Sequence, residues 1–198
     1  MTPLARAIAR LESVLAAASH PLGDPAARPH RRSPDEMALE ARESLGFDLS
    51  GELLELWSWW SMGNALAELP EALRRLDEFE LMLPGGIYLR DVEFAQRMSR
   101  DTRDSAIVNS PADLRWVPFG SIGDRLTLWC DVSDPAAAQS PVVVAGFVHP
   151  TREAIFRLDS IAALIETSAY LMDQGWWIED EDEYEGWVYE GPRDEFWF

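Results

Sequence analysis

Four short apolar runs, separated by glycine, proline and aspartate, follow one another in the second half of the chain. Each run is rich in β-branched or aromatic residues, which is the composition of a β-strand bounded by turns. The runs are residues 114–119, 125–132, 142–149 and 154–158. The sequence therefore predicts a mostly antiparallel meander of four strands in this region.

The run at 125–132 alternates regularly, with one set of side chains on each side of the predicted strand. Leu126, Leu128, Cys130 and Val132 fall on one face, and Thr127, Trp129 and Asp131 fall on the other. This period of two is typical of a strand with an apolar inner face. Because Cys130 belongs to the apolar set, we expect it to be a buried structural residue.

Helix signals surround this β-rich region. Thr2-Pro3 and the capping box Ser33-Pro34-Asp35-Glu36 predict helix starts, Gly46, Gly63 and Gly175 predict helix ends, and Ser160 predicts the start of the last helix. The helices expected lie at 3–18, 34–45, 50–63, just after Pro70, 91–100 and 160–175, with a further strand at 79–83 before a Pro-Gly-Gly turn. The pattern predicts an α+β fold with a mostly antiparallel central sheet of about four to six strands, flanked by helices.

The chain divides into three parts by composition. Pro21, Pro25, Pro29 and Pro34 block regular structure after the first helix, so residues 1–33 are expected to be a helix followed by a linker. Residues 34–178 hold the predicted α+β domain. Residues 179–198 form an acidic and aromatic extension, because ten acids and one base occur between 173 and 198.

Charge excludes two classes of partner. The chain carries a formal net charge of −18, and each of its 17 basic residues is arginine. Such a charge repels nucleic acid and anionic membranes, which bind through clustered cations. No stretch is apolar enough to span a bilayer, and the single cysteine allows no internal disulfide, so we expect a soluble cytoplasmic protein.

No constellation of catalytic or metal-binding residues is recognisable. A thiol nucleophile needs a nearby base, and the three histidines are His20 and His30 in the predicted linker and His149. The acidic run at 179–185 lacks the spacing of a calcium loop. We therefore expect no enzyme, no cofactor and no metal, and the remaining enzymatic alternative is a hydrolase whose acids cannot be chosen from one sequence.

The acidic extension combines the ingredients of a protein-binding surface, which are aromatic anchors and an attractive field. The candidate partner-binding residues are Trp176, Trp177, Glu179, Asp180, Glu181, Asp182, Glu183, Glu185 and Trp187. The alternative is that these aromatic residues pack back onto the domain as a cover strand. Trp57, Trp59 and Trp60 are predicted not to face inward together on one helix, which leaves at least one of them for a rim or an interface.

Several segments resemble the SUKH superfamily, the family of the fungal Smi/Knr cell-wall regulators and many bacterial proteins. They are ARESLGFDLSGELLELWSWWSMGN at 41–64, LRWVPFGSIGDRLTLWCDV at 114–132, PVVV at 141–144 and DSIAALIETSAYLMDQG at 159–175. The resemblance covers roughly residues 34–178. It implies an α+β domain without an active site that acts by binding other proteins.

Many bacterial SUKH-like domains are immunity proteins that neutralise a toxin, and the resemblance makes a basic, nuclease-like toxin domain the leading candidate partner. An acidic inhibitor would gain fast, electrostatically steered association with such a toxin. The alternative is a regulatory scaffold or adaptor of the Smi/Knr-like type. The identity of the partner and the oligomeric state stay open at this point.

Overall fold

Most of the helices and strands that the sequence predicts are present in the structure, which is a computed structural model. It describes residues 1–19, 33–46, 48–49, 51–60, 81–83, 85–104, 115–122, 126–134, 137, 139–146, 156–179, 187–189 and 191. For 81–82, 100–104, 177–179 and 187–189 it describes the backbone. The predicted linker, apart from its ends, and the helix expected after Pro70 lie outside the described residues.

Three of the described helices begin at the capping residues that the sequence predicts, whereas the helix expected at 50–63 ends at Trp59 and the helix expected at 91–100 extends to Asp104. They are α1 (Pro3–Ala17), α2 (Pro34–Leu45), α3 (Gly51–Trp59), α5 (Val92–Asp104) and α6 (Ile161–Asp173). The side chains of Thr2, Ser33 and Ser160 accept hydrogen bonds from the first turns of α1, α2 and α6. The capping box between Ser33 and Glu36 is complete, and Gly46 ends α2 in the left-handed conformation that the sequence predicts.

The central sheet has six strands in the order β1-β2-β3-β4-β5-β6, and each neighbouring pair is antiparallel. The strands are β1 (Leu81–Leu83), β2 (Ile87–Leu89), β3 (Trp116–Ile122), β4 (Leu126–Asp131), β5 (Val142–Gly146) and β6 (Phe156–Leu158). A separate two-stranded sheet joins β7 (Trp177–Glu179) to β8 (Trp187–Tyr189). The α+β prediction and the antiparallel meander are confirmed, whereas β2, β7 and β8 were not predicted.

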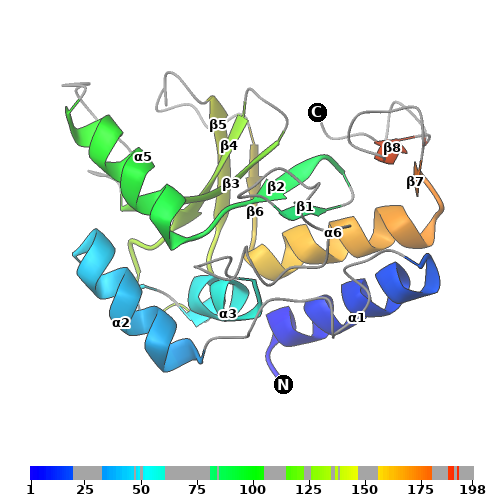
Figure 1. The fold of residues 1–198 in the computed structure, drawn as a ribbon, viewed down its shortest axis with the longest axis horizontal. Helices are drawn as coiled ribbons and strands as arrows, with labels where there is room; N and C mark the ends of the chain where they lie inside the picture. Colours follow the sequence, from blue (N-terminus) through cyan, green and yellow to red (C-terminus); the bar gives the residue numbers. More distant parts are fainter. Residues whose placement is uncertain are drawn as a thin grey trace.

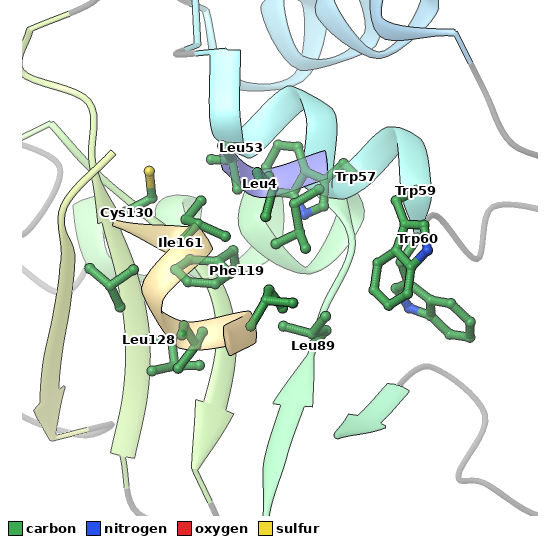
Figure 2. Close-up of a cluster of buried hydrophobic side chains, with 14 of the residues drawn as sticks. Leu4, Leu53, Trp57, Trp59, Trp60, Leu89, Phe119, Leu128, Cys130 and Ile161 are labelled. Atoms are coloured by element: carbon green, nitrogen blue, oxygen red, sulfur yellow. The ribbon is translucent and has the colours of Figure 1, made fainter. Parts of the chain in front are cut away.

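The two faces of the sheet are covered differently. On one face, side chains such as Phe119, Leu128 and Cys130 meet residues of α1, α3 and α6 in one continuous apolar core (Figure 2). On the other face, a second cluster contains Trp116, Trp129, Val143 and Ala145, with Met98 of α5 packed against it. The alternation expected for β4 is therefore confirmed, since Cys130 and Trp129 lie in different clusters.

Helix α1 belongs to the main core. It packs against α6 along its length and also contacts α3 (Figure 1). Its inward side chains, Leu4, Ala7, Ile8, Leu11 and Leu15, are all buried. The sequence assigned this helix to the N-terminal segment 1–33, and the structure packs it into the main core against α6 and α3.

Gly120 allows two strands to approach closely. The register of β3 against β4 shifts between Pro118 and Gly120, and Phe119, which lies at this irregularity, is fully buried. A Cβ atom on Gly120 would lie 2.6 Å from the carbonyl oxygen of Tyr88 in β2, so a larger residue does not fit without moving backbone. Glycine is therefore required at this position by its neighbours.

The described residues include no helix long and apolar enough to cross a membrane.

Candidate protein-binding surface

The C-terminal end of α6 positions one of the predicted anchors, Trp176. The backbone N–H of Trp176 donates to the carbonyl of Leu171, the N–H of Gly175 donates to that of Met172, and Gly175 has a positive φ of 68°. These two bonds form a Schellman motif, which commonly brings the residue after the glycine against the last turns of the helix. The sequence Gln174-Gly175 thus fixes where Trp176 lies.

Trp176 packs against Tyr170 in an edge-to-face arrangement. The ring centroids are 5.6 Å apart and the planes meet at 89°, which is a favourable geometry for two aromatic quadrupoles. Tyr170 is 41% exposed and Trp176 is half-buried. Among the side chains that the structure describes, Tyr170 is the one aromatic residue that is exposed.

The surface around this pair carries negative charge. Glu166, Tyr170 and Asp173 are spaced at four and three residues, so they share one face of α6. The last turn of α6 contains no basic residue to offset the partial negative charge of the helix C-terminus. We call Glu166, Tyr170, Asp173 and Trp176 the α6-end surface.

Arg10 of α1 supplies a cation to this surface. One guanidinium nitrogen of Arg10 donates to Oε2 of Glu166 at 2.8 Å, and the other lies 3.5 Å from Oδ2 of Asp173. The hydrogen bond with Glu166 is the main cause that raises the pKa of Arg10. All three side chains are more than 40% exposed, so the pairs are surface interactions that add little to stability.

The chain continues from Trp176 directly into the β7–β8 hairpin, beside the end of α6 (Figure 1). Trp177 is paired with Tyr189, and Glu179 is paired with Trp187. Directly opposite positions share a face of a ladder, and so do positions two apart on one strand. Three aromatic positions and one acidic position therefore fall on the same face of this hairpin.

The predicted partner-binding residues divide into two groups in the structure. Trp176, Trp177, Glu179 and Trp187 are brought together by the end of α6 and the hairpin. Asp180, Glu181, Asp182, Glu183 and Glu185 lie outside the described residues. Tyr170 and Arg10 were not identified from the sequence as part of this surface. The four-residue spacing from Glu166 to Tyr170 places both on one helix face, and the helix end predicted at Gly175 lies next to them, so Tyr170 could have been found.

The expectation that Trp57, Trp59 and Trp60 could not all face inward is wrong. All three are buried, with exposed fractions of 1%, 6% and 3%. Trp57 and Trp59 lie about 200° apart on α3, and both are buried because α1, α2 and α6 together cover more than one side of this helix. The indole N–H of Trp59 donates to Oε1 of Glu12 in α1 at 2.8 Å, which ties that ring to the neighbouring helix.

Glu52 is a buried carboxylate that sequence reasoning did not single out. It is 4% exposed, and its Oε2 atom accepts hydrogen bonds from the backbone N–H groups of Ser140 at 2.8 Å and Ile161 at 3.2 Å. Its Oε1 atom is also buried and has no hydrogen-bond partner. Burial raises the pKa of Glu52, while the backbone hydrogen bonds oppose that shift. Its role is to join α3 to the start of α6.

Cys130 forms no disulfide and is fully buried in the main core, as the strand pattern predicts. A buried thiol in apolar surroundings behaves as a small hydrophobic side chain. Within the described part of the chain, no group of three or more His, Cys, Asp or Glu residues is placed to hold a metal ion.

Comparison with models of known protein families gives no match for this chain, and comparison with curated proteins gives none either.

Proposed function

We propose that this chain is a non-enzymatic protein-binding domain of the SUKH-like immunity type, which neutralises a basic toxin domain in the cytoplasm. The resemblance rests on the sequence segments at 41–64, 114–132, 141–144 and 159–175. The observation that carries the binding surface is the pairing of Glu179 with Trp187 at the end of the β7–β8 hairpin.

The sequence that joins these two paired residues is strongly acidic. Because Glu179 and Trp187 are opposite each other, the chain that joins them starts and ends at the same end of the hairpin. That joining sequence is Asp180 to Gly186, and five of its seven residues are acidic. A basic surface would be attracted to such a run of acids and would associate faster than an uncharged surface.

Aromatic residues at the same end of the molecule supply the other part of an interface. Trp177, Trp187 and Tyr189 occupy one face of the hairpin ladder, and Trp176 and Tyr170 lie at the adjoining end of α6. Tryptophan and tyrosine are enriched among the residues that contribute most to binding, because they bury large areas and lose little side-chain entropy. Charge would bring the partner in, and the aromatic residues would hold it.

The test uses the toxin that an immunity protein is expected to accompany. We expect a neighbouring gene to encode a basic toxin domain whose expression alone stops the growth of a host cell. Co-expression of this protein should restore growth, and the two proteins should elute together in gel filtration at low salt. Growth arrest that persists although both proteins are made in soluble form would contradict the proposed function.

A further inference from the structure

We infer that the α6-end surface is a docking site for an arginine side chain of the partner. This inference rests on the proposed function, in that it names the chemical group of a basic partner that contacts this chain. It differs from the role of the hairpin acids, which attract positive charge of any kind.

The surface already holds one guanidinium group. Arg10 reaches from α1 to Glu166 and Asp173, at 2.8 Å and 3.5 Å, so the spacing of these carboxylates on α6 suits a planar group with several donors. These contacts lie on exposed side chains, and the interaction is therefore open to competition by a second guanidinium.

Tyr170 and Trp176 add an aromatic pair to the two carboxylates that Arg10 contacts. Tyr170 lies between Glu166 and Asp173 in the sequence of α6 and is 41% exposed. An arginine placed over an aromatic face gains a cation–π interaction, and its planar group can also stack, which a lysine ammonium cannot do. A guanidinium that stacks on Tyr170 would remain within reach of the carboxylates on either side.

The fold also orders this pair in advance. The Schellman bonds at Gly175 and Trp176 hold the indole against Tyr170 at a centroid distance of 5.6 Å. Binding to side chains that are already fixed avoids most of the entropy loss that flexible anchors incur. The negative end of the α6 dipole acts in the same direction, since it favours a cation close to the last turn.

The experiment compares two peptides of equal charge, hexa-arginine and hexa-lysine, for binding to the full chain at 150 mM salt. General attraction to a protein of charge −18 acts on both peptides, so the ratio of the two affinities isolates the guanidinium contribution. We expect hexa-arginine to bind about two- to fivefold more tightly, because a guanidinium adds planar stacking on Tyr170 and paired hydrogen bonds to the cation–π attraction that an ammonium shares. Y170A and W176A should bring this ratio close to one.

Two control variants complete the experiment. L39A removes another exposed apolar side chain, 59% exposed on α2, and should leave the ratio unchanged. Y170F keeps the ring and its contact with Trp176, so it should retain the preference for arginine. Far-ultraviolet circular dichroism checks that each variant is folded.

Absence of an arginine preference in the unaltered protein, or a preference that survives both Y170A and W176A, would overturn the inference. Neither result would affect the proposed function, which depends on rescue of growth by the whole protein. Conversely, an arginine preference in a protein that fails to rescue growth would leave this site in place and remove the toxin as its target.

Discussion

Oε2 of Glu52 accepts a 2.8 Å hydrogen bond from the backbone N–H of Ser140, which is 88 residues further along the chain. The same oxygen also accepts from Ile161, at the first turn of α6. One carboxylate on α3 therefore joins the segment before β5 to the helix that carries the α6-end surface. The N-terminus of a helix favours a negative group at this position, because its first N–H groups have no partner within the helix.

Replacing Glu52 with alanine is expected to lower the free energy of unfolding by about 2–4 kcal/mol, because it leaves two buried N–H groups without an acceptor. Glu52→Gln keeps one acceptor oxygen at the same place and should cost about 1 kcal/mol or less. Urea unfolding at pH 7 measures both changes. Equal losses in the two variants would show that the negative charge of Glu52, which both variants remove, matters more than its packing or the presence of an acceptor oxygen.

The pH dependence of stability should reveal the raised pKa of Glu52. A raised pKa in the folded state means that this group favours folding most when it is protonated, below its ordinary value of 4.5. That contribution is lost as the pH rises through the folded-state pKa. The unfolding free energy of the unaltered protein, minus that of Glu52→Gln, should therefore fall between pH 4 and the folded-state pKa and then level off.

Urea unfolding of both proteins from pH 4 to pH 8 measures this difference. Glu52→Gln serves as the reference because it removes the titrating group and leaves the other acids in place. A difference that rises with pH would mean that the hydrogen bonds from Ser140 and Ile161 outweigh the effect of burial.

Features encoded by a few neighbouring residues were predictable from the sequence. The capping box at Ser33, the left-handed glycine at Gly46 and the alternation along β4 depend on local geometry, and each is confirmed. The fold class was also predictable. It depends on the type and order of the strands and capped helices along the chain, and not on which of them pack together.

Features that depend on distant residues were not predictable. Strand β2 has three residues, Ile87–Leu89, and it is recognisable only when β1 and β3 pair on either side of it. The burial of Glu52 depends on Ser140 and Ile161, and an acid at the start of a helix is otherwise typical of a solvent-exposed position. The α6-end surface could not be predicted without knowing that α1 lies beside α6, since Arg10 comes from α1.

Gly120→Ala should destabilise the protein by about 1–3 kcal/mol or more, because the new methyl group would overlap the backbone of β2. The obstacle is the carbonyl oxygen of Tyr88, which cannot turn aside as a side chain could. Gly51→Ala is the matched control, since nothing lies within 4 Å of its added Cβ and the position begins α3. That control should be neutral or stabilising by up to about 1 kcal/mol. Thermal unfolding of the two variants compares them, and similar melting temperatures would contradict the close approach at Gly120.

Leu11→Ala should lower the free energy of unfolding by about 2–5 kcal/mol, the usual effect of removing a fully buried leucine side chain. Leu11 is 0% exposed at the contact of α1 with the main core. Leu39→Ala, at an exposed position on α2, should change stability by less than about 0.5 kcal/mol. Chemical denaturation measures both. A loss for Leu11→Ala as small as that for Leu39→Ala would mean that α1 is only loosely attached and that the stable unit begins near Pro34.

Neutralising three acids of the segment between β7 and β8 should slow association with the toxin domain identified by growth rescue. The variant changes Glu181 and Glu183 to Gln and Asp182 to Asn. We expect the association rate constant to fall about three- to tenfold at low salt and to depend less on salt. The dissociation rate constant should be nearly unchanged, because charges at the rim of an interface act mainly during the encounter.

The control removes the same number of charges from exposed positions on α2 and α5, with Asp35 changed to Asn and Glu43 and Glu93 changed to Gln. If net charge alone mattered, both triple variants would slow association equally in stopped-flow measurements. A larger effect of the hairpin variant would place the steering charge beside the aromatic residues of β7 and β8, and an unaltered rate at low salt would remove electrostatic steering from the proposed mechanism.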